Sequence, residues 1–245
     1  MNLDGKKILI TGGGSGIGLE LARRVAGTNE VMIGGRDESK LERAQAQTPA
    51  LKTVRLDVTS EDETRHALTA VAEALGGLDL LVNSAGVMGS YAFSSPEAGA
   101  KSTEEVEVNL GGAIRISRLA LPLLERSSEA GVVFMSSAVA FAAVPGFAVY
   151  GATKAAIHSL ARSLRAELAS KRVRVFEVVP PLVDTELAGG LDVPKIQPAA
   201  VVDAIVAGLE RNREEIRVDR IKQLVPIARF VPRLGDRLVQ RALVP

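Results

Sequence analysis

Short apolar segments alternate with longer helix-like segments along most of the chain, and this alternation limits the possible folds more than any other feature. Strand-like runs rich in β-branched and aliphatic residues lie at 7–11, 30–34, 53–57, 78–83, 131–137 and 173–179. Helical patterns lie between them at 16–27, 38–47, 61–75, 102–126 and 149–170. The short runs are almost continuously apolar, as in strands that a parallel sheet buries on both faces. The sequence therefore predicts a doubly wound, Rossmann-type α/β fold with a mainly parallel sheet and helices on both faces.

The pattern becomes looser after residue 179. Segment 180–198 is rich in Pro and Gly and predicts a loop with one short helix, followed by a helix at 198–211 and a short strand near 215–218. A basic, partly helical tail ends the chain. We find no linker, repeat or low-complexity segment, so we expect residues 1–245 to form a single domain.

Composition excludes several classes of function. Lys and Arg number 30 against 29 Asp and Glu, which gives no electrostatic reason to expect nucleic-acid binding. The absence of cysteine removes disulfides and thiolate chemistry, and no His/Asp/Glu cluster has metal-ligand spacing, so we expect no metal. The chain begins without a signal-peptide pattern and has no membrane-spanning apolar run, so we expect a cytoplasmic protein.

A glycine-rich turn, TGGGSGIG at 11–18, joins the first strand to the first helix. Gly12, Gly16 and Gly18 would let the turn run tight, so that backbone N–H groups at a helix N-terminus could approach a pyrophosphate. A plain glycine-rich turn is the alternative. The predicted dinucleotide contacts are Thr11, Gly12, Gly14, Ser15, Gly16, Ile17 and Gly18.

The end of the second strand indicates which dinucleotide is preferred. An acidic residue there would accept hydrogen bonds from the adenosine ribose, but the chain has Gly35 followed by Arg36. A guanidinium suits a 2′-phosphate, so NADP(H) is favoured and NAD(H) stays as a second cofactor. Asp37 is a competing partner for Arg36, and a solvated surface arginine is the alternative interpretation.

Further polar residues follow the third and fourth strands, where doubly wound sheets bind ligands. Asp57 would accept the adenine amino group, and Asn83 would tie backbone across the crevice. Each is equally compatible with a turn role. The residues predicted to contact the cofactor here are Asp57, Val58, Asn83, Ala85 and Gly86.

The segment AVYGATKAA places Tyr150 and Lys154 four residues apart on one helical face. An ammonium group beside a phenol lowers the pKa of the phenol from about 10 toward the range of a general acid–base. The preceding strand-like run ends at Ser137, whose hydroxyl could hold a carbonyl oxygen. We therefore predict that Tyr150 and Lys154 are catalytic.

Together these motifs resemble the short-chain dehydrogenase/reductase family, in the shorter of its main branches. The family pattern T-G-x-x-x-G-x-G falls on residues 11–18, and Tyr-x-x-x-Lys falls on Tyr150 and Lys154, thirteen residues after Ser137. The resemblance also implies a role for Asn109. It implies that Tyr150 transfers the proton, that Lys154 lowers the pKa of Tyr150 and holds the nicotinamide ribose, that Ser137 orients the substrate and that Asn109 supports a proton relay.

Two positions depart from the family pattern. Ser84 replaces the second asparagine of N-N-A-G, and Pro181 replaces the glycine of P-G-x-V-x-T. The motif still predicts cofactor contacts at Pro180, Val183 and Thr185. Its Pro-Pro form resembles that of a bacterial subgroup described as DltE-like oxidoreductases.

The resemblance implies an NADP(H)-dependent oxidoreductase acting on a carbonyl or alcohol, with residues 1–130 mainly binding the cofactor and 131–245 carrying catalysis, the substrate loop and the tail. Apolar residues in 180–198 predict a hydrophobic small-molecule substrate. The family also implies a homodimer or homotetramer. A non-catalytic nucleotide sensor or scaffold on the same fold is the alternative.

Two histidines, one tyrosine and the arginines of the tail lie outside these motifs. His66 and His158 are expected to serve in packing or at an interface, and Tyr91 either lines the substrate pocket or packs in its loop. Arginines recur every fourth position from 229 to 241 and would form one basic stripe on a helix. We favour a tail helix that packs on the body, with contact to an anionic membrane surface as the alternative.

Overall fold

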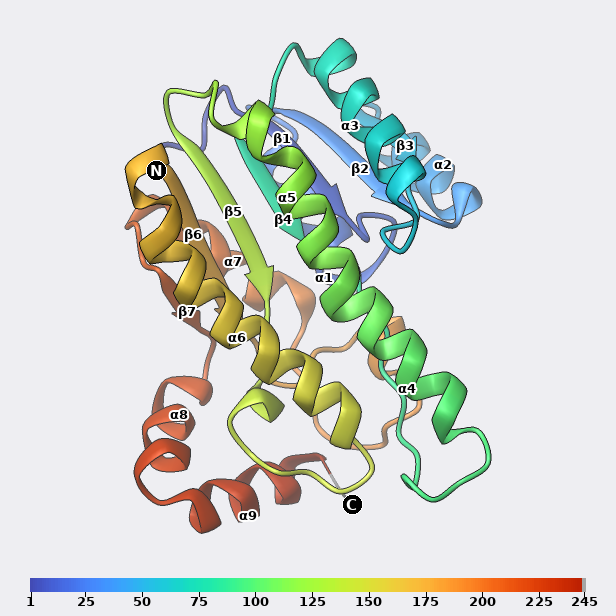
Figure 1. Ribbon diagram of the computed structural model, residues 1–245, viewed down its shortest axis with the longest axis vertical. Coiled ribbons are helices and arrows are strands. Elements are labelled where there is room, and N and C mark those ends of the chain that lie inside the picture. Colours follow the sequence, from blue (N-terminus) through green and yellow to red (C-terminus); the bar gives the residue numbers. More distant parts are fainter. Residues whose placement is uncertain (244–245) are drawn as a thin grey trace.

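A seven-stranded parallel sheet, in the order β3-β2-β1-β4-β5-β6-β7, runs through the centre of the molecule in a computed structural model that describes residues 1–243 (Figure 1). The strand order reverses between β1 and β4, which creates the crevice where such sheets bind ligands. The strands are β1 (Lys7–Thr11), β2 (Glu30–Gly35), β3 (Leu51–Arg55), β4 (Leu80–Asn83), β5 (Ala130–Met135), β6 (Val173–Val179) and β7 (Glu215–Arg217).

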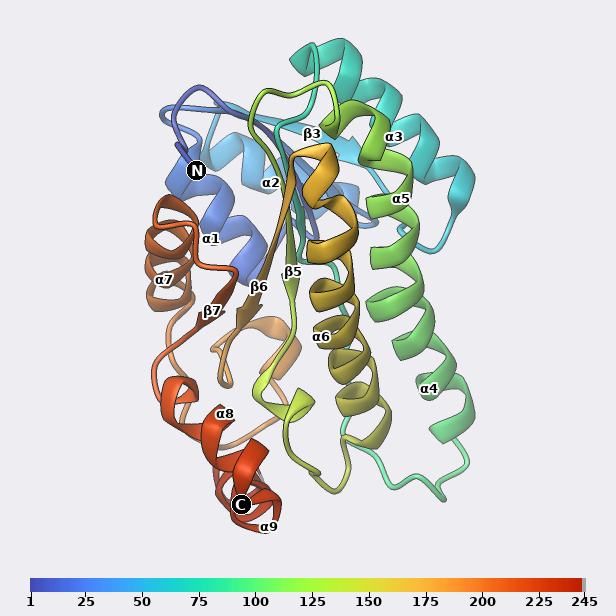
Figure 2. The ribbon, with the colours of Figure 1, turned by 60° about the vertical axis from the view of Figure 1, so that its left-hand side comes forward.

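Helices cover both faces of this sheet (Figure 2). Successive residues of β1 point to opposite faces, so Ile8 and Ile10 join one buried cluster and Leu9 joins the other. The first cluster contains residues of α1 (Gly16–Val25), α2 (Glu38–Gln47) and α7 (Pro198–Glu210). The second contains residues of α3 (Glu61–Leu75), α5 (Ala113–Leu124) and α6 (Ala148–Leu168). The predicted doubly wound fold is confirmed.

Two predicted elements differ most from the structure, whereas the others differ by at most two residues at either end. The third strand ends at Arg55 rather than at Asp57, because the Asp57 carboxylate accepts the Thr59 N–H and turns the chain there. The helix predicted at 102–126 is three segments: α4 (Ala98–Val106), a π-helical turn (Glu107–Gly112) and α5. The π-helical turn adds a residue to the helical repeat, which periodicity alone does not reveal.

The end of the described chain forms two helices, α8 (Ile221–Phe230) and α9 (Pro232–Leu243), which meet at a corner at the lower end of the molecule (Figures 1 and 2). The predicted single stripe of arginines is therefore wrong: Arg229 lies on α8 and the other three lie on α9. Pro232 causes the break, because it lacks an N–H and disfavours helical backbone at Val231.

The predicted packing of the tail on the body is confirmed. Val239 of α9 is buried, the Asp236 carboxylate accepts the Ala143 N–H at 2.8 Å, and Gln240 donates to the Ala143 carbonyl at 2.7 Å. In the described part of the chain, no helix is both long and apolar enough to cross a bilayer.

Candidate active site

The glycine-rich turn after β1 is packed so closely against the turn after β4 that side chains are excluded. Gly12 has a φ of +64°, and a Cβ atom there would lie 2.8 Å from backbone atoms of Ala85. A Cβ atom on Gly18 would lie 2.6 Å from the carbonyl oxygen of Gly12. Gly16 also has a positive φ, of +54°. These three glycines are therefore required by backbone geometry as well as by the predicted motif.

Thr11 joins the two turns. Its hydroxyl accepts the N–H groups of Ser84 and Ala85, each at 3.1 Å. This is the backbone tie that we expected from Asn83, and that expectation is wrong. The Asn83 amide instead donates to the Ser117 hydroxyl at 3.1 Å, because the side chain points toward α5. The Asn83 amide oxygen is buried without a hydrogen-bond partner among the described residues.

The first turn of α1 has the features of an anion site. The Ser15 side chain makes no capping bond, and no acidic residue occupies the first turn, so the N–H groups there are available to a phosphate. A Cβ on Gly16 would lie 3.1 Å from the Thr185 methyl group, which brings the loop after β6 beside this turn. The glycine-rich turn and the first turn of α1 therefore fit the pyrophosphate of a dinucleotide. Of the remaining predicted contacts, Gly14 faces Lys40, while Ile17, Pro180 and Val183 line the cavity described below.

Arg36 lies exposed at the end of β2. Its guanidinium is 3.8 Å from the Glu104 carboxylate of α4, in a pair in which both side chains are about half exposed. Asp37 does not pair with Arg36: it caps α2, accepting the Lys40 N–H at 3.1 Å and the Ser39 hydroxyl. Among the described residues, the one ion pair of Arg36 is therefore a weak surface pair.

Asp57 and Val58 lie just beyond β3. Burial raises the pKa of Asp57, but hydrogen bonds from Thr59 and the nearby Arg36 charge outweigh that effect and lower it overall. The carboxylate is thus ionised at neutral pH and can accept a hydrogen bond. Val58 is buried, and its carbonyl accepts a hydrogen bond from Arg115.

The predicted catalytic residues converge at the carboxyl ends of β4 and β5. Tyr150 and Lys154 lie on the first turns of α6, and both are buried. The Lys154 Nζ atom is 5.4 Å from the centre of the Tyr150 ring and donates to the Met135 carbonyl at 3.0 Å. Ser137 follows β5 in extended conformation, and its hydroxyl interacts with the Tyr150 phenol.

The pKa values of this pair differ from the sequence-based expectation. Burial raises the pKa of Tyr150 to about 12, although the Ser137 hydroxyl opposes part of this rise. Burial also lowers the pKa of Lys154 to about 8. The expected lowering of the Tyr150 pKa by Lys154 is therefore wrong for the protein without a cofactor, because loss of water disfavours both charged forms. At neutral pH Tyr150 is a protonated phenol.

Asn109 lies in the π-helical turn and is buried. Its amide oxygen accepts the Val87 N–H at 2.8 Å, and its amide nitrogen donates to the Val87 carbonyl at 2.9 Å and to Thr153 at 3.3 Å. A Cβ atom on Gly86 would lie 3.1 Å from the Asn109 oxygen and 3.8 Å from Lys154 Nζ. Asn109 thus holds the segment after β4 against the helix that carries Tyr150.

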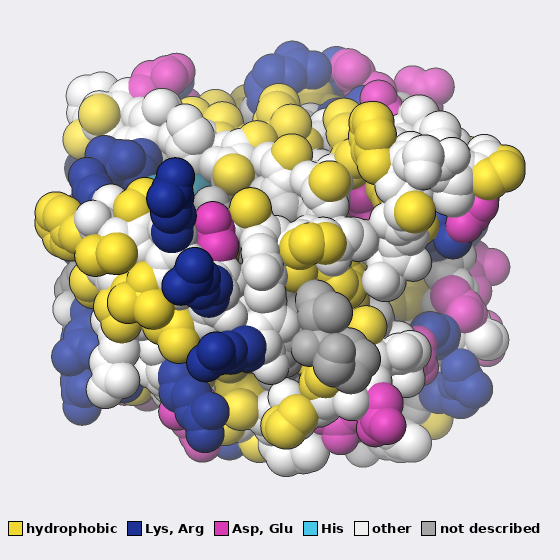
Figure 3. Space-filling model, turned by 90° about the horizontal axis from the view of Figure 1, so that it is seen from below, with side chains coloured by type: hydrophobic (Ala, Val, Ile, Leu, Met, Phe, Trp, Pro, Cys, Tyr) yellow, Lys and Arg dark blue, Asp and Glu magenta, His cyan; other side chains and the backbone are white. Residues whose placement is uncertain are grey.

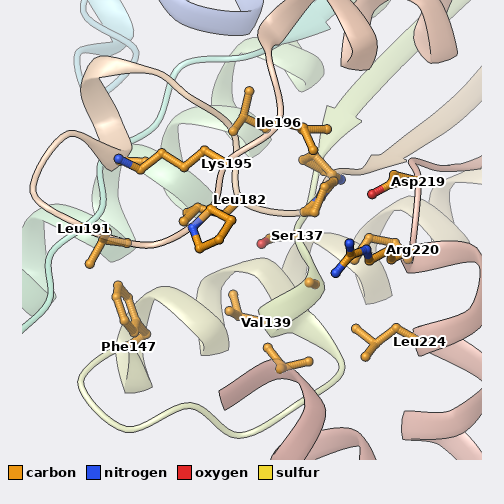
Figure 4. A pocket seen from close by; sticks show the side chains of 18 of the residues that line it. Ser137, Val139, Phe147, Leu182, Leu191, Lys195, Ile196, Asp219, Arg220 and Leu224 are labelled. Atoms are coloured by element: carbon orange, nitrogen blue, oxygen red, sulfur yellow. The ribbon is translucent and has the colours of Figure 1, made fainter. Parts of the chain in front are cut away.

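An apolar cavity of about 580 Å³ opens beside Ser137 and Tyr150. Figure 4 shows Leu182 and Leu191 of the 180–198 loop on one side of Ser137 and Leu224 of α8 on the other. The loop closes on itself through a bridge between Val183 and Ile196. The sequence predicted that apolar side chains of the 180–198 loop line the substrate site. It did not predict the contributions of Phe147, α8 and α9 to the cavity wall, because no local pattern indicates where the tail packs.

Tyr91 and the two histidines lie outside the catalytic group. Tyr91 does not line the cavity; its hydroxyl donates to Glu105 at 2.8 Å, so it packs in its loop. His66 is exposed on α3. The His158 ring lies 2.9 Å from the buried Glu177 carboxylate and edge-on to Phe141, with centroids 4.7 Å apart. The expected packing role of His158 is confirmed.

The fold and this site define a dinucleotide-dependent oxidoreductase of the Rossmann type, and comparison with known proteins identifies its family. Residues 6–194 match the short chain dehydrogenase family. The chain is 34% identical to the uncharacterized oxidoreductase DltE of Bacillus subtilis over 232 residues, covering 91% of this chain and 92% of that protein. An uncharacterized oxidoreductase of Staphylococcus epidermidis is 33% identical over 209 residues, covering 83% and 90%. The chain therefore belongs to the short-chain dehydrogenase family.

Solved structures agree with this assignment. A short chain dehydrogenase from Burkholderia cenocepacia, in complex with NADP, has a TM-score of 0.85 and 28% identity, with both chains fully covered. A 3-ketoacyl-(acyl-carrier-protein) reductase from Brucella melitensis, complexed with NADH, has a TM-score of 0.81 and 28% identity, covering 89% of this chain and 98% of that one.

Proposed function

We propose that the protein is an NADP(H)-dependent reductase of hydrophobic ketones or aldehydes, which also oxidises the corresponding alcohols. One observation carries the proposal: the Tyr150 phenol and the Ser137 hydroxyl lie together at the wall of an apolar cavity of about 580 Å³. A cavity of this kind accommodates an apolar carbonyl compound, and only the carbonyl oxygen needs polar partners.

The residues have distinct roles in this proposal. The bound nicotinamide supplies or accepts the hydride. Ser137 donates a hydrogen bond that fixes the carbonyl oxygen, and the neutral Tyr150 phenol donates its proton to that oxygen as the carbon–hydrogen bond forms. The Lys154 ammonium stabilises the phenolate left behind and holds the nicotinamide ribose. Asn109 holds the segment after β4 in place beside Tyr150 and supports the relay that returns a proton to the phenolate.

Arg36 and Gly35 support the cofactor preference. Gly35 occupies the position where an acidic residue would repel a 2′-phosphate, and the half-exposed Arg36 can turn from Glu104 toward that phosphate. One structural relative is a complex with NADP and another is a complex with NADH, so we propose NADP(H) as preferred and NAD(H) as usable.

We also retain the division near residue 130 into a cofactor half and a catalytic half as a proposal. The exposed Val106 of α4 and Ile114 of α5 support a homodimer or homotetramer through these helices. A cytoplasmic location remains a prediction.

The proposed function is tested with a panel of apolar and polar ketones and aldehydes, read by NADPH absorbance. We expect turnover that rises with the apolar area of the substrate until the cavity is filled. A protein that binds NADPH but turns over no member of the panel, in either direction, would support the non-catalytic alternative instead.

A further inference from the structure

The outer face of the α8–α9 corner combines exposed apolar side chains with exposed arginines. We propose that this face binds the surface of an anionic lipid bilayer. We call it the basic corner, and it consists of Arg229, Phe230, Val231, Arg233, Leu234, Arg237, Leu238 and Arg241. This proposal goes beyond the proposed reaction and does not depend on it.

The apolar part of the basic corner is unusually exposed. Phe230 is 81% exposed, Val231 51%, Leu234 43% and Leu238 37%. These four make up half of the large apolar side chains that are exposed in the described part of the chain, yet they fall within nine consecutive residues. Such clustering marks an interaction surface, whereas single exposed apolar side chains do not.

The charged side chains of the basic corner are all positive. Arg229, Arg233, Arg237 and Arg241 are all exposed, and none forms an ion pair with the residues that the structure describes. Figure 3 shows a row of basic side chains beside a band of apolar ones on the lower surface of the molecule. The one carboxylate of α9, Asp236, is directed toward the Ala143 N–H on the body.

Geometry and charge favour lipid over a second copy of the chain. A two-fold interface would place the same patch against itself, so the arginines of one copy would face those of the other. The corner also protrudes at the lower end of the molecule (Figures 1 and 2), whereas a peptide or helix partner needs a groove. A protruding aromatic flanked by arginines suits the interface between headgroups and acyl chains, with the guanidinium groups on the phosphates.

The body side of the same helices contributes to the cavity. Leu224 and Ile227 of α8 and Val239 of α9 line it. Leu238 of the basic corner lines it as well, so the two surfaces meet at this residue. A bilayer at the corner would therefore lie close to the site where an apolar substrate has to enter.

Co-sedimentation of the full-length protein with vesicles tests the proposal without any need for turnover. We expect the protein to sediment with vesicles of mixed phosphatidylglycerol and phosphatidylcholine, and not with phosphatidylcholine alone. Binding should weaken as salt is raised, because screening reduces the attraction. Arg233→Glu/Arg237→Glu should weaken partitioning by roughly tenfold or more. Phe230→Ser should weaken it at constant charge.

The matched control is Arg43→Glu/Arg213→Glu, which makes the same change in net charge at exposed sites on α2 and in the turn after α7. This control should bind vesicles like the unmodified protein, and circular dichroism should show that every variant is folded. Equal losses in the control, or no vesicle binding by the unmodified protein, would overturn the proposal. So would a dimer that Phe230→Ser dissociates in light scattering, because the occupant would then be a second copy.

Discussion

The two sides of the crevice are built in different ways. On the nucleotide side, the turn after β1 meets the turn after β4 backbone to backbone, and a single added methyl group at Gly12 would lie 2.8 Å from Ala85. On the substrate side, a loop and two terminal helices meet through apolar side chains around a cavity of about 580 Å³. The first side fixes its shape by backbone contact, and the second by side-chain volume.

This difference separates the tasks of the two sides. A phosphate must meet N–H groups at hydrogen-bond distance, so the backbone there tolerates little displacement. An apolar substrate needs shape and exclusion of water, which many combinations of side chains can provide. Ser137 and Tyr150, the groups to which we assign the chemistry in our proposal, lie where the two sides meet.

The largest expected effect tests that junction. Tyr150→Phe removes the proposed proton donor but keeps the ring that packs in the apolar cluster, so we expect turnover to fall by about 10²–10⁴-fold while NADPH binding is retained. Single-turnover rates with saturating NADPH, together with a binding titration, measure both quantities. Near-normal chemistry in the folded variant would remove Tyr150 from the mechanism.

A second prediction concerns the pKa of the Tyr150 phenol in the folded protein. In Tyr91→Phe the only tyrosine left is Tyr150, and the chain has no tryptophan, so ultraviolet absorbance reports Tyr150 alone. We expect tyrosinate to appear with a pKa of about 12 in the folded protein, against about 10 after unfolding in guanidinium.

Proton linkage determines how the stability of the protein changes with pH. A raised folded pKa means that Tyr150 contributes stability below pH 10, and that this contribution is lost as the pH rises toward 12. Tyrosinate absorbance in the folded protein near pH 8 would show that Lys154 outweighs burial, contrary to this structure.

The third prediction concerns the backbone packing on the nucleotide side of the crevice. Gly12→Ala forces a positive φ on alanine and a backbone clash, so we expect a loss of about 1–3 kcal/mol of unfolding free energy and strongly weakened NADPH binding. Its control is Gly99→Ala on α4, where an added methyl meets nothing within 4 Å. That variant should be neutral or more stable by up to about 1 kcal/mol. Thermal denaturation compares the two, and equal effects would contradict the packing argument.

The smallest effects concern the cofactor preference. Arg36→Ala should weaken NADPH binding by roughly ten- to a hundredfold, because one charged hydrogen-bonding partner is lost, and should change NADH binding little. Glu104→Gln should strengthen NADPH binding by less than about fivefold, since it frees Arg36 from an exposed pair. Titrations with both cofactors measure this. Parallel losses for NADPH and NADH in Arg36→Ala would show that the arginine supports the fold instead.

The sequence predicted the nucleotide side of the crevice better than the substrate side. β1, α2 and α3 in the cofactor half have the predicted bounds, as does β6 in the other half, because periodicity, glycines and capping residues act locally. The pairing of Tyr150 with Lys154 also follows from helical spacing alone. The raised pKa of Tyr150 could not be predicted, because it depends on burial by segments distant in the chain. The contribution of Val239 to the cavity depends on tertiary packing in the same way.

The short chain dehydrogenase match ends at residue 194, whereas α8 and α9 begin after residue 220. These two helices follow all seven described strands in the sequence, so they join a sheet whose strands have already been synthesised. Because they add no strand to that sheet, substitutions at their exposed positions leave the strand order and the glycine-rich turn after β1 unchanged. This arrangement separates the variable part of the fold from the dinucleotide-binding part, so that changes in α8 and α9 can alter the cavity wall and the outer surface without altering the strands.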